Sequence, residues 1–296
     1  MRKQNWSGVI FLALFVFLCC SSAQGAYKIG VLAKRGGVKA MTKWGWHGAY
    51  LSKKLGDQFI IVPLKFASID QAVKNRDIDF LLANPALFIE MQEKYEVEAI
   101  NTMINLRNGE AVDKFGGVLL VLKSSPISKL SDIKGKRFGF VKHSSFGGLH
   151  MAKYLLQKNG INPEKDCTKY LELKTHDKVV KAVLSKKIDV GTVRSDTLER
   201  MADEGKINMA DFRIIHKIDD DFPFVHSTRL YPEWPLARLA HVDAKLGEKV
   251  SRALIDLGTK SKPAEKAHIA GWEAPIDYGP VLECLWTIKF GVFADQ

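Results

Sequence analysis

A short polar turn carries two serines and two glycines, the residue types of an anion-binding site. The turn, KHSSFGG at 142–148, follows a predicted strand that ends at Val141 and precedes a predicted helix. Unpaired N–H groups at a helix start carry partial positive charge, and the hydroxyls of Ser144 and Ser145 could donate beside them. Serine is also a favoured N-cap residue, so an ordinary helix start is the equal alternative.

An arginine follows another predicted strand. Arg194 comes directly after the run at 188–193, and its planar guanidinium has the shape to bind an oxyanion. The alternative is an internal ion pair with Asp196 or Glu199, which follow two and five positions later.

Three more candidates stand after predicted strands. Asn84 precedes Pro85, and proline is favoured at the first helical position, so Asn84 either caps a helix or faces a ligand. Phe66 and His176 follow the second strands of two similar segments, and we expect both to face one cleft. For His176, the choice between a ligand contact and a structural role stays open.

These residues are positioned by β-rich runs that alternate with helical patterns. Such alternation favours α/β units built around parallel strands. The first segment has predicted strands at 27–32, 59–66 and 78–82, with helices at 46–55 and 69–74; the second has strands at 137–141, 170–173 and 188–193, with helices at 146–159 and 177–185.

The two segments agree in spacing. Gly30 lies 49 positions before Asp79, and Gly139 lies 50 positions before Asp189. We therefore expect two related lobes. The runs at 116–122 and 225–240 would carry the chain between them and form a hinge of two crossovers. The expected parts are a leader at 1–26, lobe one at 27–117, lobe two at 118–226, and a return to lobe one at 227–296 that includes a helix at 248–258.

The first 26 residues have the pattern of a secretory signal peptide. Arg2 and Lys3 provide the positive start, an apolar run covers 9–20, and small residues at 21–26 suit a cleavage site. The apolar run is short for a bilayer-spanning helix, which needs about 20 residues. We expect export, cleavage and a soluble periplasmic protein.

The cysteines give little structural or metal-binding capacity. Cys19 and Cys20 fall in the leader, and Leu18 stands where a lipidated cysteine would need a small residue. Cys167 and Cys284 remain, too few for a disulfide framework or a four-ligand metal site. They fall in different lobes, so we expect free thiols, and no metal or other cofactor is expected.

The composition narrows the function classes. The net charge is +11, or +9 without the leader, but the basic residues are scattered and no Lys/Arg block with interleaved aromatics appears. Export also makes nucleic acid an unsuitable partner, which leaves small anions or a solvated basic surface. No GxSxG or paired catalytic carboxylates appear, and Ser144 or Ser145 beside His143 is too local for a triad. We expect no enzyme.

The motifs resemble the periplasmic binding proteins of phosphonate and phosphate type. The resemblance rests on LSDIKGKR at 130–137, SSFGG at 144–148, the Ile78-Asp79 and Asn84-Pro85 elements, and the pair His176 and Asp189. Segments at 189–194, 227–235 and 272–278 are similar to the sensor domains of tetrathionate-type histidine kinases within that family. The resemblance implies a type II periplasmic binding fold, with two lobes that each hold a sheet flanked by helices.

The resemblance also implies roles for particular residues. Ser144 and Ser145 match the hydroxyl donors to a phosphonate, and His176 matches the histidine after the second strand of lobe two. Asp196 matches an acidic residue that holds the amine of the ligand.

Two departures change the expected ligand. The two tyrosines that the family uses in lobe one correspond to Phe66 and Phe88, so two hydroxyl donors are missing. Arg194 points instead to a ligand with more oxyanion character, and we expect Arg194→Ala to lose tight binding.

The expected function is therefore the binding of a small anionic solute by a monomer. The solute would be a phosphonate-like, phosphate-like or sulfur oxyanion. The expected partner is the permease of an ABC importer at the inner membrane, and the alternative is a sensor histidine kinase for which this chain would be the ligand-binding input.

Overall fold

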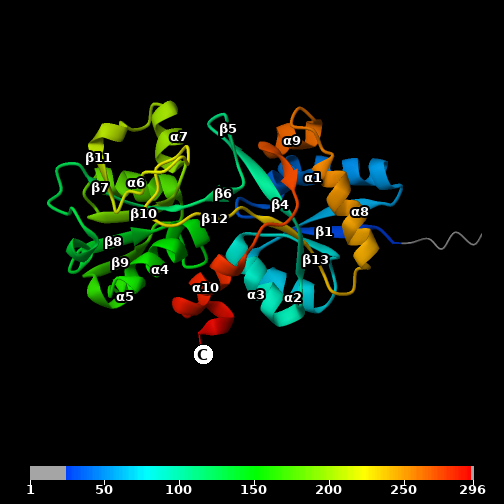
Figure 1. The fold of residues 1–296 in the computed structure, drawn as a ribbon, viewed down its shortest axis with the longest axis horizontal. Helices are drawn as coiled ribbons and strands as arrows, with labels where there is room; N and C mark the ends of the chain where they lie inside the picture. The colour runs from blue at the N-terminus through cyan, green and yellow to red at the C-terminus, as the bar shows by residue number, and fades with distance from the viewer. Residues whose placement is uncertain (1–24, 295–296) are drawn as a thin grey trace, which may run out of the picture.

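Two β-sheets, each covered by helices, form the two halves of the molecule (Figure 1). The computed structural model describes residues 25–294. The half on the first sheet is called lobe one here, and the half on the second sheet lobe two. The expected leader at 1–26 lies, apart from its last two residues, outside the described residues. Within residues 25–294, no helix has the length and apolar character needed to cross a bilayer.

The sheet of lobe one has the strand order β14-β4-β13-β3-β1-β2, with β5 paired to β4. Its strands are β1 (Tyr27–Leu32), β2 (Phe59–Leu64), β3 (Phe80–Leu82), β4 (Glu98–Arg107), β5 (Glu110–Val112), β13 (Pro235–Arg238) and β14 (Ile269–Glu273). Its helices are α1 (Gly37–Leu55), α2 (Phe66–Lys74), α3 (Pro85–Tyr95), α8 (Ala244–Ile255), α9 (Lys262–Ala267) and α10 (Gly279–Thr287).

The sheet of lobe two has the order β11-β7-β10-β8-β9. Its strands are β7 (Gly117–Leu122), β8 (Arg137–Phe140), β9 (Lys169–Glu172), β10 (Val190–Arg194) and β11 (Phe212–Ile215). A π-helical turn (Phe146–His150) leads directly into α4 (Met151–Lys158), followed by α5 (Pro163–Asp166), α6 (His176–Leu184) and α7 (Thr197–Asp203).

The predicted α/β architecture is confirmed, with two departures. The parallel pairs are β1 with β2 and β3, and β8 with β9 and β10. Both sheets are nevertheless mixed, because β13 runs antiparallel to β3 and β7 runs antiparallel to β10. The ten-residue strand β4 was not predicted.

Helix α1 is longer than the sequence pattern suggested. It begins at Gly37 rather than at residue 46. Ala40, Trp44, Gly48 and Leu51 are buried along it, and their spacing of three to four residues forms one apolar face. The extra turns place Lys43 on a helix rather than in a loop.

The similar spacing of Gly30 to Asp79 and of Gly139 to Asp189 predicted two related lobes. In the structure, both aspartates accept the same backbone hydrogen bond. In lobe one, the backbone N–H of Lys28 donates to Asp79 Oδ2 at 2.7 Å. In lobe two, the backbone N–H of Arg137 donates to Asp189 Oδ2 at 2.8 Å. Each carboxylate thus fixes the start of the first strand of its unit.

A repeated close approach accompanies this bond. A Cβ at Gly30 would lie 2.6 Å from Ile78 Cδ1, and a Cβ at Gly139 would lie 2.3 Å from Ile188 Cδ1. Both distances are below van der Waals contact. Glycine in the first strand therefore lets the residue before the third strand pack against the backbone in both lobes.

The chain crosses between the lobes twice, through two short strands paired side by side (Figure 1). These are β6 (Lys114–Phe115) and β12 (Tyr231–Pro232), which are antiparallel. The backbone N–H of Glu233 continues the pairing by donating to Asp113 O at 2.7 Å. The predicted boundaries at 117 and 226 fall close to these strands and stay predictions. Cys167 and Cys284 are free thiols.

Candidate anion-binding site

Arg194, the last residue of β10, is held by two carboxylates and one aromatic ring. Its Nη2 donates to Glu233 Oε1 at 2.8 Å, and its Nε lies 3.2 Å from Asp196 Oδ1. The guanidinium carbon lies 4.3 Å from the ring centroid of Phe115. Pairing with Asp196 was one of the predicted alternatives; pairing with Glu199 does not occur, and Glu233 takes that place.

A second ion pair crosses between the lobes. Arg107, at the end of β4, places its Nε 3.0 Å from Asp196 Oδ2. The carboxylate of Asp196 is 7% exposed and that of Glu233 is 0% exposed. Such burial costs free energy that the pairing has to offset. The two arginines and two carboxylates therefore form one neutral quartet that links β4 and β12 of one side to β10 of the other.

The charges of the quartet stabilise one another. Burial alone would raise the pKa of Glu233, but Arg194 and Arg107 lower it below its ordinary value. Asn105 Nδ2 also donates to Glu233 Oε1 at 2.9 Å. Burial acts to lower the pKa of Arg194, while Asp196 and Glu233 raise it above its ordinary value. The charged forms of Glu233 and Arg194 are thus both favoured by their partners in the quartet.

His176 begins α6 and contacts the same strand end. Its Nδ1 accepts a hydrogen bond from the backbone N–H of Arg194 at 3.2 Å. Burial, followed by the nearby charge of Arg194, lowers the pKa of His176 well below its ordinary value. The ring is therefore neutral and carries its proton on Nε2, which makes Nε2 a donor.

The serine turn lies beside Arg194. Ser144 and Ser145 are both half-buried, and Ser145 stands at the N-cap position without a side-chain cap hydrogen bond. A Cβ at Gly147 would lie 3.0 Å from Arg194 Cβ, so the start of the π-helical turn packs against this arginine. Ser145 therefore does not make the side-chain hydrogen bond that an ordinary helix N-cap makes.

Two lysines of lobe one complete the cluster. The Nζ of Lys34, in the turn after β1, lies 4.2 Å from the ring centroid of Trp234. The Nζ of Lys43, on α1, lies 4.8 Å from the ring centroid of Trp44. In residues 25–294, neither ammonium group takes part in an ion pair within 4.0 Å.

The lysines feel the positive charge of the arginines. Burial, followed by Arg194, lowers the pKa of Lys34 to about 7, against the opposing effect of Glu233. Burial, followed by Arg107, lowers the pKa of Lys43 to about 8. Lys34 is an exposed residue, so water moderates the effect of burial on its pKa, while the neighbouring charges keep the direction of the shift.

Three further predicted site residues take no part in the ion pairs of the quartet. Asn84 is buried and caps α3, accepting a hydrogen bond from the backbone N–H of Leu87 at 3.2 Å. Phe88 is 1% exposed and packs its ring edge against Tyr278, so it offers no surface to a ligand in this conformation. Phe66, at the start of α2, is 40% exposed.

Sequence reasoning missed Lys34, Lys43, Arg107 and Glu233. One signal was present: Lys34 precedes two glycines after the first strand, as the serine turn contains two glycines after the equivalent strand of lobe two. Glu233 reaches Arg194 only because β6 and β12 pair between the lobes.

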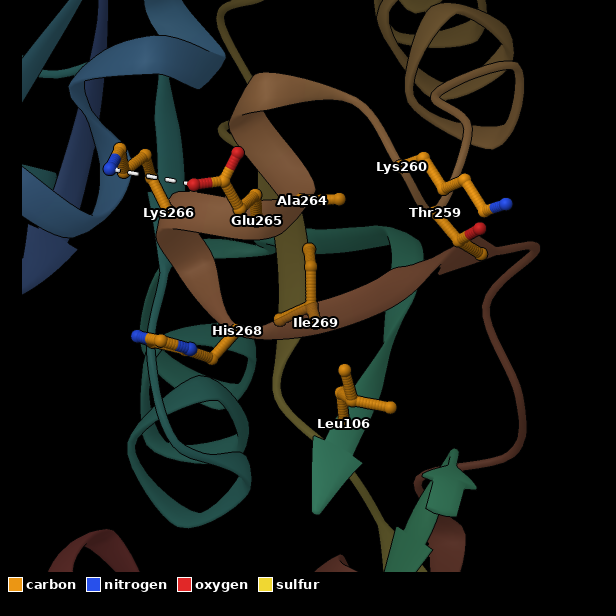
Figure 2. A pocket seen from close by; sticks show the side chains of 8 residues that line it. All are labelled: Leu106, Thr259, Lys260, Ala264, Glu265, Lys266, His268 and Ile269. Carbon is orange, nitrogen blue, oxygen red and sulfur yellow. Dashed lines mark ion pairs between the residues drawn. The ribbon is translucent and has the colours of Figure 1, made fainter. Parts of the chain in front are cut away.

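A separate hollow of about 480 Å³ lies on lobe one (Figure 2). It is lined by Leu106, Thr259, Lys260, Ala264, Glu265, Lys266, His268 and Ile269. Leu106 neighbours Arg107 on β4, and successive side chains of a strand point to opposite faces. The hollow is therefore on the other face of β4 from the quartet. Among the described residues, no group of His, Cys, Asp or Glu side chains could hold a metal ion.

Comparisons with known proteins show the family of the chain. The sequence model of a protein family described as "ABC transporter, phosphonate, periplasmic substrate-binding protein" matches residues 29–277. A curated relative, the tetrathionate sensor histidine kinase TtrS of Salmonella typhimurium, is 30% identical over 98% of this chain. The match covers 48% of that relative, so the chain spans about half its length.

Solved structures share the fold at low sequence identity. PhnD1 of Prochlorococcus marinus, in complex with methylphosphonate, has a TM-score of 0.66 at 16% identity, covering 89% of this chain and 98% of that one. XAC2383 of Xanthomonas citri, bound to ATP, has a TM-score of 0.69 at 16% identity, covering 90% and 98%. The fold is the two-lobed fold of such binding proteins, and the chain belongs to the family of phosphonate-type periplasmic substrate-binding proteins of ABC transporters.

Proposed function

We propose that this protein binds a small oxyanion between its two lobes. The observation that carries the proposal is the gathering of four cationic side chains around only two carboxylates. Arg194 comes from lobe two, and Arg107, Lys34 and Lys43 come from lobe one. A small anion placed among them would contact both lobes and favour their closure, a hinge motion about β6 and β12.

The ligand class follows from what the site lacks. Asp196 is paired to Arg107 and Arg194, so its carboxylate is not free for a ligand amine. Phe66 and Phe88 supply no hydroxyl. A phosphonate-like, phosphate-like or sulfur oxyanion without an amino group therefore suits the site better than an aminoalkylphosphonate.

A screen by thermal unfolding tests the proposal. A ligand that binds only the folded protein raises its unfolding temperature by mass action. Phosphate, phosphite, methylphosphonate, methanesulfonate, sulfate, thiosulfate and tetrathionate would each be added over a range of concentrations. We expect at least one to raise the unfolding temperature in a saturable way, whereas no shift with any of them would contradict the oxyanion assignment.

Delivery of the solute to an ABC permease is the function that matches the family. In this role the protein would be a soluble periplasmic monomer after removal of its leader. The transport role is tested by measuring how fast cells with and without this protein take up the identified ligand. Uptake that does not depend on the protein would exclude the transport role.

A sensory role is a second candidate, favoured by the 30% identity to TtrS over almost the whole chain. In that role the closed, ligand-bound protein would contact a sensor histidine kinase. The test measures phosphorylation of a sensor kinase with and without this protein. Phosphorylation that depends on the ligand and occurs only when this protein is present would support the sensory role over transport.

A further inference from the structure

The charges of the candidate site divide into a neutral group and an uncompensated pair. Arg107 and Arg194 are matched by Asp196 and Glu233, with ion-pair distances of 2.8 to 3.2 Å. Lys34 and Lys43 lie beside this quartet, and within residues 25–294 neither has a carboxylate partner. When both are protonated, the two lysines therefore bring two positive charges that no carboxylate in this part of the chain pairs, and Arg35 adds its positive charge near Lys43.

We propose that Lys34 and Lys43 are the direct contacts of the ligand and that they select a doubly charged oxyanion. This inference rests on the proposed function and names its contacts and charge class. In it, Arg194 is a positioning residue: it holds Glu233 and Asp196 and shapes the lobe-two side of the site, rather than supplying the free charge.

Each of the two ammonium groups lies over an aromatic ring. Lys34 lies over the ring of Trp234, the residue that follows Glu233, and so is fixed next to the crossover between the lobes. Lys43 projects from α1 over the ring of Trp44, which is buried in the same helix. Cation–π contacts of this kind hold a cation in place without neutralising it. Both charges stay available to a ligand.

The free site stores repulsion that a dianion would relieve. Arg194, Arg107 and Lys43 act against the charge of Lys34, and Glu233 is the carboxylate that opposes them. For Lys43, burial is the largest cause that lowers the pKa and Arg107 the next; Glu233 opposes them, and Arg35 and Arg194 add to them. Two negative charges would balance the two lysines, whereas a single charge would leave one lysine uncompensated.

The test compares lysine variants with a matched control. Lys34→Met and Lys43→Met each remove a charge at similar length. Lys53→Met removes the same charge from the last turn of α1, about 15 Å further along the helix. The probes are sulfate, a dianion, and methanesulfonate, a monoanion of similar size, titrated by calorimetry.

We expect wild type and Lys53→Met to bind sulfate alike and much more tightly than methanesulfonate. Each site variant should bind sulfate about tenfold or more weakly, the effect of losing one charged hydrogen bond. Without ligand, both site variants should unfold at the same or a higher temperature than wild type, because a repelled charge has gone. A folding defect would lower that temperature and cannot mimic this combination.

The failures are distinguishable. If wild type binds sulfate but both lysine variants match it, or if methanesulfonate binds as tightly as sulfate, the inference is overturned and the proposed function stands. If wild type binds neither these probes nor any oxyanion of the thermal screen, the proposed function fails, and the inference fails with it.

Discussion

The first strands of the two lobes begin alike and end differently. β1 and β8 both start with a backbone N–H bound to an aspartate, Asp79 or Asp189. β1 then runs into a turn with Lys34, while β8 runs into the serine turn at 142–148. The two lobes share the framework of the repeat and differ at the strand ends that lead into the candidate site.

The third strands diverge in the same way. β3 is followed by Asn84, a buried helix cap, while β10 ends in Arg194, paired across the lobes to Glu233. Lobe one therefore supplies the free cations, and lobe two supplies neutral donors together with an arginine that is already paired. The difference suggests that one lobe attracts the anion and the other orders it.

The largest expected effect comes from breaking the quartet. Arg194→Ala leaves the buried Glu233 without its arginine, which costs about 3 kcal/mol of stability. Loss of this pair at the ligand site should also weaken sulfate binding about a hundredfold. Urea unfolding and calorimetric titration measure the two effects.

A double variant and a control sharpen that experiment. Adding Glu233→Gln to Arg194→Ala removes the uncompensated carboxylate, so part of both losses should be recovered. Arg213→Ala, in β11, removes donors to the carbonyl groups of Ser125 and Ile127 and should lower stability with unchanged affinity. A double variant no better than the single one would contradict the quartet.

The pH dependence of binding is the next largest effect. The pKa of Lys34 is lowered from 10.5 to about 7 in the free protein by burial and Arg194, and a bound dianion would raise it again. Sulfate binding then takes up a proton above pH 7, so affinity is highest below pH 7 and falls by up to about tenfold per pH unit above it. Titrations from pH 6.5 to 9 measure this slope.

The stability of the ligand-free protein should rise with pH, whereas the affinity for sulfate falls. Between about pH 7 and 10.5 the folded protein binds fewer protons at Lys34 than the unfolded chain, so the free energy of unfolding without ligand rises with pH. Lys34→Arg keeps the charge at all these pH values and should weaken both trends, leaving the part above about pH 8 that comes from Lys43. Equal affinity of wild type at pH 6.5 and 9 would show that Lys34 does not titrate with binding.

The smallest effect concerns the shared framework. Asp79→Asn and Asp189→Asn each weaken one backbone hydrogen bond and should lower stability by about 1 kcal/mol, with no change in sulfate affinity. Asp189 should lose more, because it also pairs with Arg137. Arg137 lowers the pKa of Asp189, so this contribution is present above pH 3.8 and lost as pH falls below it. A large change in affinity for either variant would mean that framework and site are not separate.

The sequence predicted what depends on local pattern and spacing. β1 was placed at its observed bounds, and the equal distances to Asp79 and Asp189 predicted the repeat because the aspartates are part of its framework. His176 and Arg194 were placed at strand ends that do meet, as the hydrogen bond between them shows.

The rest depends on contacts between distant segments. Arg107 lies on β4, a strand whose mixture of polar and apolar residues did not show a clear period. Glu233 meets Arg194 only through the pairing of β6 and β12, which no local pattern encodes. The predicted helix at 46–55 left out the first half of α1, which carries Lys43.

The central claim is that the anion sits against the lysines of lobe one. A crystal structure with selenate, a dianion of the same shape as sulfate, tests it most directly, because the anomalous signal of selenium marks the ligand. The account predicts a peak within hydrogen-bond distance of Lys34 Nζ and Lys43 Nζ, with the serine turn on its other side. A peak in the hollow lined by Lys260 and Lys266, or at Ser144 and Ser145 without the lysines, would contradict it.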